Sequence, residues 1–345
     1  MRIGIVAITA GGRRLAEELA GKLEGARHLE TPEGRKVADT IASAWAACDA
    51  LICIMATGIV VRAIAPLVRD KATDPCVIVM DELGRYAISL LGGHLGGGNA
   101  LVKKIARLTG GQAVITTASD TRGLVALDIW AEKQHLAADR QTLTAAAAAL
   151  VNRGELRLYS EVPVHGLPPG LILEKDAAVA DVIVSSSTRF DGSRPFIFRP
   201  RNLVVGVGCN RGTRYLEFEE ALEELFTDLR LSRETIRNLA SIDKKGDEPG
   251  LLEFAADNHW PIDFFSADRI NALSDPAILD ISRAAMKAVG AIGVAEPSAL
   301  LSAAGDAAPP ANLEKLLLSR KRKWKNVTLA VAEAPFSLSA QVPDP

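Results

Sequence analysis

The chain has 345 residues, of which 48% are hydrophobic and 24% are charged, and its formal net charge is −2. This length exceeds that of one typical hydrophobic core and predicts two or three domains. Because the net charge is close to zero, we expect no global attraction to nucleic acid or to an anionic membrane, and an anionic ligand would need a local basic cluster.

Cysteine spacing and hydropathy limit the class of protein further. None of the four cysteines forms a C-x-x-C pair, which argues against a zinc knuckle or a redox motif, and scattered cysteines suit a reducing cytoplasm. No apolar stretch approaches the roughly 20 residues needed to cross a bilayer. The first residues are typical of a strand followed by a helix rather than a signal peptide. We therefore expect a soluble, cytoplasmic protein.

Residues 1–130 alternate short apolar runs with helical patterns. Continuous Val- and Ile-rich strands separated by helices predict a largely parallel sheet covered on both faces. The predicted strands are Ile3–Ile8, Ala50–Met55, Val77–Met80, Tyr86–Leu90 and Ala113–Thr116, and the predicted helices begin or lie at Arg14–Leu23, Gly58–Ala65 and Asn99–Leu108.

The pattern weakens over residues 131–200, which we interpret as a variable middle domain or linker with an alanine-rich helix. A second α/β domain is predicted over 201–335, from the strand Leu203–Val207 and the helix Tyr215–Leu229 to a final strand in "NVTLAVAEA". Residues 336–345 are expected to be a frayed tail. The predicted fold class is therefore α/β, with two largely parallel, helix-covered sheets joined by a smaller middle domain.

The stretch "MATGIVVRAIAPLVRDK" places polar groups after a predicted strand. Thr57 and Gly58 would expose backbone amides at a helix start, where an anion is favoured. Arg62 follows one turn later, and Lys71 lies in the next loop. These residues are candidates for carboxylate or phosphate binding, and the alternative is a capped helix with solvated charges.

The segment "GGHLGGGN" surrounds His94 with five glycines. Glycines let a ligand approach the backbone and leave amides to donate, so Gly96, Gly97 and Gly98 are candidate oxyanion donors beside a titratable imidazole. Asn99 is predicted to cap the following helix. The alternative is a histidine that only fills a turn.

Two further motifs are less specific. "GVGCNRGT", which contains Gly208, has one residue too many for the dinucleotide fingerprint, so its glycines favour a tight strand-to-helix turn or some other anion site. "SRKRKWKN" is typical of a solvated loop, although a polyanionic small molecule or RNA would also suit it. The five histidines show no metal-ligand spacing, so we expect no protein metal site.

Taken together, "MATGIVVRAIAPLVRDK", "SLLGGHLGGGNALVKKIA" and "AVITTASDTRG" resemble the N-terminal region of the CbiG family, the cobalt-precorrin-5A hydrolases of anaerobic cobalamin biosynthesis. "LVVGVGCNRGT", "LASIDKKGDEPGLLEFA", "AIGVAEPSALL" and "NVTLAVAEA" resemble the C-terminal domain of that family. The departure is "TRYLEFEEAL" after the glycine loop, where a short Ser-Ala-Glu-Glu type start is expected.

The resemblance implies the reaction. Water opens the δ-lactone of a ring-contracted cobalt corrinoid, and a two-carbon fragment leaves as acetaldehyde to give cobalt-precorrin-5B. The cobalt comes with the substrate, so no cofactor of the protein is implied. By residue type, His94 is the candidate base, and Glu296, which follows an apolar run taken as a strand, or Asp120 is the candidate acid or orienting group.

Other readings stay open. A non-catalytic corrinoid carrier of the same pathway is the alternative function, and a nucleotide-dependent α/β enzyme is a third. The expected partners are the corrinoid substrate, transient contacts with neighbouring pathway enzymes and a second copy in a homodimer, with no nucleic acid and no membrane.

Overall fold

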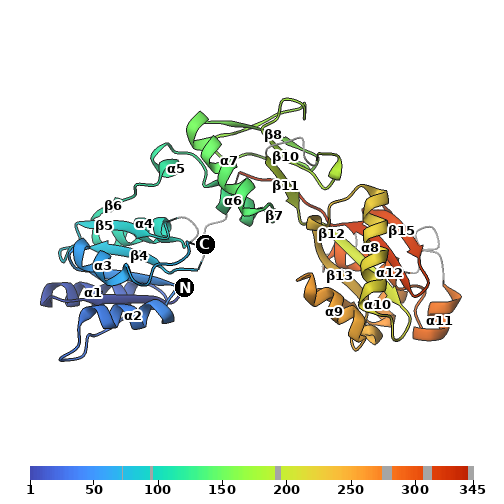
Figure 1. Cartoon of the computed structure of the whole chain (residues 1–345), viewed down its shortest axis with the longest axis horizontal. Coiled ribbons are helices and arrows are strands. Elements are labelled where there is room, and N and C mark those ends of the chain that lie inside the picture. The colour runs from blue at the N-terminus through green and yellow to red at the C-terminus, as the bar shows by residue number, and fades with distance from the viewer. Residues whose placement is uncertain (72, 94–95, 191–195, 274–281, 306–312, 341–345) are drawn as a thin grey trace. The chain divides into compact units, whose positions relative to one another are not determined.

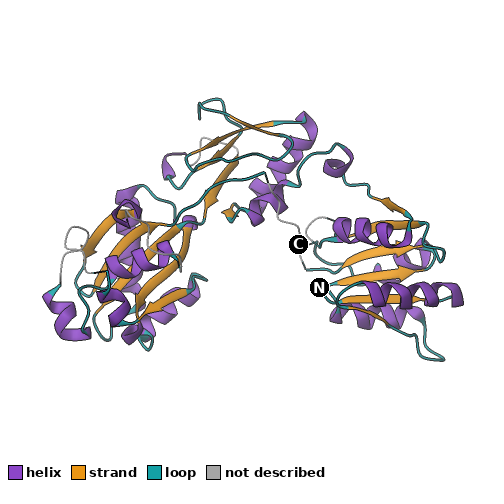
Figure 2. Ribbon diagram, turned by 180° about the vertical axis from the view of Figure 1, so that it is seen from behind, coloured by secondary structure: helices purple, strands orange, loops and turns teal. Residues whose placement is uncertain are grey.

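The structure is a computed structural model of the chain, and it describes all residues except 72, 94–95, 191–195, 274–281, 306–312 and 341–345 (Figure 1). The chain divides into two compact units, residues 1–129 and 130–345. The chain is an α/β fold, as predicted: two of its three sheets have mainly parallel pairings (Figure 2). The third, in the C-terminal region, has two parallel and two antiparallel pairs, so the expectation of a largely parallel sheet there is wrong. In the part of the chain that is described, no helix is long and apolar enough to cross a membrane.

The first unit contains a six-stranded sheet in the order β2-β1-β3-β4-β5-β6. All pairs are parallel except β4 with β5. Strands β1, β3 and β4 are buried along their whole length, as expected for a sheet covered on both faces. The strands are β1 (Ile3–Ala7), β2 (Ala26–His28), β3 (Ala50–Ile54), β4 (Cys76–Met80), β5 (Tyr86–Leu91) and β6 (Gln112–Val114).

Helices cover the two faces of this sheet in pairs. Helices α1 (Ala10–Lys22) and α4 (Gly98–Thr109) pack on one face, while α2 (Val37–Ala47) and α3 (Thr57–Ile64) pack on the other. Alternation along β3 serves both cores, because Ile52 faces the first pair of helices and Cys53 faces the second. The helix α2 and the strand β2 were not predicted, and the first predicted helix begins earlier than Arg14.

Strand β5 runs antiparallel to β4, so it ends at the other edge of this sheet. Strands β1, β3 and β4 are parallel, so their carboxyl ends lie at one edge, where α1 and α3 begin. Met80 pairs with Ala87 and Val77 pairs with Leu91, so the carboxyl end of β5 lies at the opposite edge. The glycine-rich segment after Leu91 therefore starts at the edge opposite to Thr57.

The second unit begins with a small five-stranded sheet in the order β7-β11-β10-β8-β9, in which only β7 is antiparallel. It carries the predicted alanine-rich helix α7 (Arg140–Arg153), and α6 (Leu127–Lys133) precedes it. The strands are β7 (Leu136–Ala137), β8 (Leu156–Ser160), β9 (Leu171–Leu173), β10 (Val182–Val184) and β11 (Phe196–Pro200).

The other sheet of this unit has the order β14-β13-β12-β16-β15. Helices α8 and α9 cover one face, and α10 and α12 cover the other. The first predicted helix of this domain, Tyr215–Leu229, is confirmed residue for residue. The elements are β12 (Leu203–Cys209), α8 (Tyr215–Leu229), β13 (Ile236–Ile242), α9 (Pro249–Asp257), β14 (Ile262–Phe265), α10 (Ala267–Asn271), α11 (Arg283–Val289), α12 (Ala295–Ala304), β15 (Leu317–Lys323) and β16 (Val327–Glu333).

A glycine lets α12 approach the central strand of this sheet. A Cβ atom on Gly206 would lie 1.9 Å from the carbonyl oxygen of Ala295 and 2.9 Å from the Cβ of Ala299. Only a residue without a side chain fits between β12 and the helix at this point. Gly206 therefore fixes where α12 begins.

The expected frayed tail is wrong over its described part. Leu338 is fully buried, its amide donates to the Pro163 carbonyl oxygen (2.9 Å), and its own carbonyl accepts from the His165 amide (2.8 Å). The Trp130 indole donates to the Ser339 carbonyl (3.1 Å). One buried leucine and these hydrogen bonds hold residues 336–340 to the middle region.

The close approach at Gly206 predicts a large effect of one methyl group. Gly206→Ala should lower the free energy of unfolding by about 1–3 kcal/mol or more, because the added carbon would overlap backbone that cannot move alone. The matched control is Gly208→Ala in the same strand, where the added carbon would meet Val294 at an ordinary 3.5 Å. Equal denaturant midpoints for the two variants would contradict the packing argument.

Candidate functional site

A cavity of about 900 Å³ opens at the carboxyl edge of the sheet that contains β12. It lies among the ends of β12 and β13, the segment from Ser282 to the first turn of α12, and the β15–β16 connection. Ligands of open α/β sheets bind outside the carboxyl ends of the strands, where helices diverge to the two faces. Its volume is in the upper range of pockets that bind small molecules.

Basic side chains predominate in the described lining of the cavity. Such a lining favours an anionic ligand even though the whole chain is slightly negative. The basic residues are Arg211, Lys244, Lys245, Lys321, Lys323 and Lys325, and the acidic ones are Asp243, Asp247 and Glu296.

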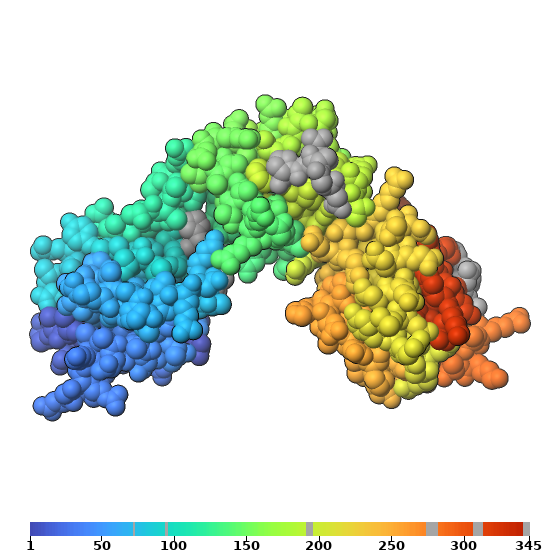
Figure 3. Space-filling model, viewed as in Figure 1, coloured from blue at the N-terminus to red at the C-terminus, as the bar shows by residue number. Residues whose placement is uncertain are grey.

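The basic run "SRKRKWKN", interpreted above as a solvated loop, has side chains on two faces: some line the cavity and others face α8. The run belongs largely to β15, so Lys321, Lys323 and Lys325 line the cavity. Between them, Arg322 pairs with Asp228 of α8 (2.7 Å), and the Trp324 indole donates to Glu224 of α8 (2.8 Å). In Figure 3, residues of β15 (red) lie beside those of α8 (yellow). The solvated-loop interpretation is therefore wrong.

Glu296 lies in the first turn of α12 and lines the cavity. No strand precedes it, contrary to our expectation, because residues 291–294 form a bend before the helix. The side chain is only 3% exposed. It accepts a hydrogen bond from the Lys321 amide (2.9 Å) and faces the Lys321 ammonium at 3.8 Å. Gly208 lines the same cavity, so the structure brings two predicted site residues together.

A buried ion pair lies at the end of β13. Lys245, 7% exposed, lines the cavity, and its ammonium lies 3.7 Å from Oε2 of Glu248, which is 1% exposed. The other oxygen of Glu248 accepts from the Gly212 amide (2.6 Å), and Arg211 lies 3.6 Å from Oε2. Sequence reasoning missed Lys245 and Glu248, although "DKKGDEP" after a strand is the signal that marks them.

Thr213, two residues before α8, does not cap that helix. Arg214 occupies the N-cap position, and the Thr213 hydroxyl donates to the Asn210 carbonyl (2.8 Å) instead. Gly212, with φ of 72°, makes the left-handed turn between β12 and the helix. The glycine loop is thus a tight connection, as its spacing indicated.

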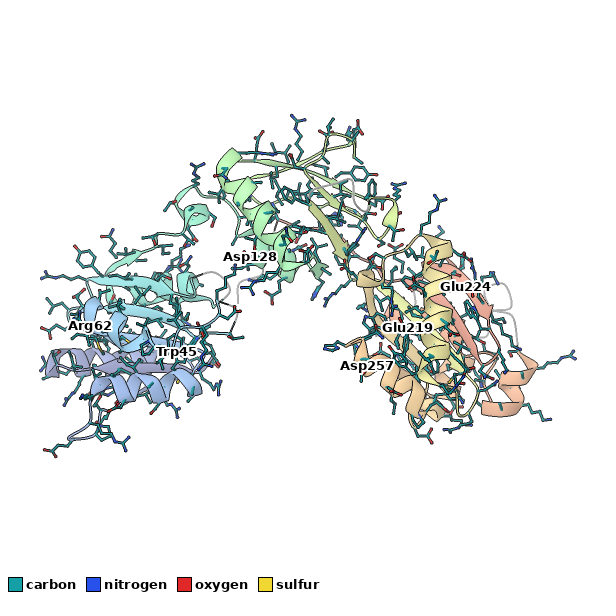
Figure 4. The ribbon with its side chains drawn as sticks, in the orientation of Figure 1. Trp45, Arg62, Asp128, Glu219, Glu224 and Asp257 are labelled. Carbon is teal, nitrogen blue, oxygen red and sulfur yellow. The ribbon has the colours of Figure 1, made fainter. Side chains whose placement is uncertain are left out.

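In the first unit, the predicted anion-binding residues meet at the start of α3. The guanidinium of Arg62 folds back over this turn, with Nη2 3.4 Å from where a Cβ of Gly58 would lie (Figure 4). Thr57 is the first residue of the helix. Because α1 and α3 leave the neighbouring strands β1 and β3 toward opposite faces, this is a switch point of the sheet. Lys71 is exposed in the loop beyond α3.

The glycine segment at the opposite edge is closely packed. His94 itself lies outside the described residues. The Gly98 amide donates to the Gly92 carbonyl (3.1 Å), so it is already engaged and is not a free oxyanion donor. A Cβ on Gly96 would lie 2.7 Å from that same carbonyl oxygen, whereas Gly97 has φ of 73° and is the N-cap of α4. Close packing therefore accounts for much of the glycine content.

Asn99 does not cap α4, because Gly97 precedes the helix and Asn99 lies inside it. Its side-chain amide donates to Thr117 Oγ1 and to Asp120 Oδ2, both at 2.8 Å. Asp120 also pairs with Lys103 at 3.0 Å. The structure thus joins Asn99 and Asp120 next to the glycine segment. Thr57, Gly58 and Arg62 lie at the other edge of the same sheet.

Metal binding and nucleophilic attack by a thiol are two other chemistries to consider at the cavity wall. Among the described residues, no three His, Cys, Asp or Glu side chains are grouped as metal ligands, so none is assigned to a metal. Cys209 lines the cavity, and burial raises the pKa of its thiol to about 11. Cys209 is therefore a thiol near neutral pH and is poorly suited to act as a nucleophile.

This pKa predicts slow alkylation of Cys209. Below pH 11 the thiolate fraction falls tenfold per pH unit, so iodoacetamide at pH 8 should label Cys209 about 100-fold more slowly than a thiol of pKa 9.0. Peptide mapping by mass spectrometry measures this, with the urea-unfolded chain as control. Native labelling as fast as in urea would show that Cys209 is reactive.

Comparison with known proteins identifies the family. The family model described as "Cobalamin synthesis G N-terminal" matches residues 39–120, and "Cobalamin synthesis G C-terminus" matches residues 203–332. A cobalt-precorrin-5A hydrolase of Priestia megaterium is 33% identical over 83% of this chain and 79% of its own length. One of Salmonella typhimurium is 31% identical over 88% and 92%. Protein CobE of a Sinorhizobium species is 30% identical over 40% of this chain and 84% of its own length. The chain belongs to the CbiG family, as the resemblance of its motifs had indicated.

Proposed function

We propose that this chain is a cobalt-precorrin-5A hydrolase of cobalamin synthesis, which opens the δ-lactone of its substrate with water and releases acetaldehyde. The relatives that match most of the chain carry this name. The observation in the structure that supports it best is the basic cavity at the carboxyl edge of the second unit. A corrinoid carries acetate and propionate side chains, and a lining of this charge suits them.

The exposed lysines of the cavity are the proposed carboxylate contacts. Among the described residues, Lys323 and Lys325 have no ion-pair partner within 4 Å. Their long side chains can follow the periphery of a large ligand. Gly208, in the floor formed by β12, lets a flat ring approach the backbone. In the first unit, Thr57, Gly58, Arg62 and Lys71 are the proposed contacts.

Lactone opening needs a base for water and an acid for the leaving oxygen. His94 is the proposed base. Glu296 is the proposed acid or orienting group, since its carboxyl group lines the cavity and is held by Lys321. Asp120, which is paired with Asn99 and Lys103, can orient a neighbouring group more readily than it can transfer a proton itself.

We propose no cofactor resident on the protein, because the cobalt arrives in the substrate. Cytoplasmic location remains part of the proposal, supported by the four free cysteines. The corrinoid is the one partner that the proposal requires.

Acetaldehyde release tests the function. Purified chain incubated with cobalt-precorrin-5A should give one acetaldehyde per corrinoid, measured by trapping with a hydrazine. His94→Gln should bind the corrinoid but release acetaldehyde about 10²–10⁴-fold more slowly, because amide cannot act as a base. Corrinoid binding by the wild-type chain without any acetaldehyde would instead identify a carrier. Near-normal release by His94→Gln would remove His94 from the chemistry.

Arg62 gives a second test, of binding. Arg62→Ala should weaken corrinoid affinity about tenfold or more, since a charged hydrogen bond is worth about 1.5–3 kcal/mol. The matched control is Arg69→Ala, an exposed arginine in the following loop. Titration followed by corrinoid absorbance measures both. Equal affinities for wild type and Arg62→Ala would place the first unit's contact elsewhere.

A further inference from the structure

The buried pair Lys245–Glu248 is incompletely satisfied. Lys245 can donate three hydrogen bonds, but among the described residues its ammonium makes none, and its ion-pair partner lies at 3.7 Å. Oε2 of Glu248, the oxygen facing that ammonium, is buried and has no hydrogen-bond partner. Buried charges are costly unless hydrogen bonds compensate them. A pair left in this condition at a cavity wall indicates a role beyond stability.

The surroundings hold the ammonium in one place. Lys245 ends the short 3-10 turn Asp243–Lys245, directly after β13, and Glu248 is the N-cap residue of α9. The Gly212 amide fixes Glu248 from the neighbouring loop. The carboxylate therefore positions Lys245 from the protein side, while the cavity lies on its other side.

From this arrangement we propose that Lys245 is the oxyanion donor of the lactone-opening step and that Glu248 is its positioning residue. The inference rests on the proposed function. When water attacks the lactone carbonyl carbon, the base of the site takes one proton from that water, the C=O electron pair moves onto oxygen, and the Lys245 ammonium donates a hydrogen bond to that oxygen. The C=O bond then re-forms, the ring C–O bond breaks, and the departing oxygen takes a proton from the acid of the site, which leaves a carboxyl group and a hydroxyl group.

The nearby carboxylate favours this role over plain carboxylate binding. Glu248 partly neutralises Lys245, which weakens its attraction for a full negative charge in the ground state. A charge that develops only in the transition state still gains from a fixed donor in a buried site. The exposed Lys323 and Lys325 are better suited to the substrate's permanent carboxylates.

The test separates turnover from binding. Lys245→Met alone would take the buried Glu248 carboxylate's nearest buried cation away and leave only the exposed Arg211 beside it, so the principal variant is Lys245→Met with Glu248→Gln, which removes both charges of the pair. We expect kcat for acetaldehyde release to fall about 10²–10³-fold, with the corrinoid dissociation constant changed by less than about threefold. Circular dichroism and a thermal melt show that the variant is folded. Lys287→Met, on the exposed part of α11 outside the cavity, is the matched control.

Each other outcome overturns either the role proposed for Lys245 and Glu248 or the proposed function itself. An unchanged kcat in a folded double variant overturns the inference alone. Loss of affinity with kcat retained overturns it as well, because Lys245 would then be a ground-state ligand. No acetaldehyde from the wild-type chain overturns the proposed function and the inference with it. Glu248→Gln alone should lower kcat less than the double variant, and an equal or greater loss would contradict its positioning role.

Discussion

The contact between Gly206 of β12 and the first turn of α12 decides the geometry of the second unit. Because the helix backbone lies against the strand backbone, α12 starts beside the carboxyl end of β12, and Glu296 is placed in the cavity wall. Glu296 in turn accepts a hydrogen bond from the Lys321 amide and thereby fixes the end of β15. The alternation of β15 then turns every second basic residue toward the cavity. The absence of a side chain at Gly206 thus determines the position of α12, the end of β15 and, through them, the charge of the cavity.

The cavity shows how a chain with a net charge of −2 can still have a basic site. Acidic side chains are used on the outer face, where Asp228 and Glu224 of α8 hold Arg322 and Trp324 away from the cavity. In Figure 4, Glu224 and Glu219 mark that helix. Lys323 and Lys325, which have no ion-pair partner within 4 Å among the described residues, line the inner side. Local charge separation, rather than overall composition, makes the site basic.

Sequence periodicity predicted the regular elements well and the charged ones poorly. The helix Tyr215–Leu229 and the Val- and Ile-rich strands were found because burial imposes a clear period on apolar residues. Strand β15 was missed because its alternation is between two kinds of basic residue, which no hydropathy pattern distinguishes. The strand expected before Glu296 and the cap expected at Asn99 were wrong, since a bend precedes α12 and the left-handed Gly97 is the N-cap of α4. The Lys245–Glu248 pair depends on a 3-10 turn that brings residues from two element ends together, which spacing alone does not reveal.

In the second unit the candidate residues line one cavity, whereas in the first unit they lie at two opposite edges of one sheet. In the first unit Arg62 lies over the start of α3 at a switch point, and the glycine segment with Asn99 and Asp120 lies at the opposite edge. One sheet cannot bring both groups to the same small ligand from opposite edges. A ligand that contacts Arg62 and a reaction that uses the glycine segment therefore need either a large ligand or two separate roles. The corrinoid of the proposed reaction is large and carries carboxylates around its ring, so Arg62 can be a contact for its periphery without lying near the reacting lactone.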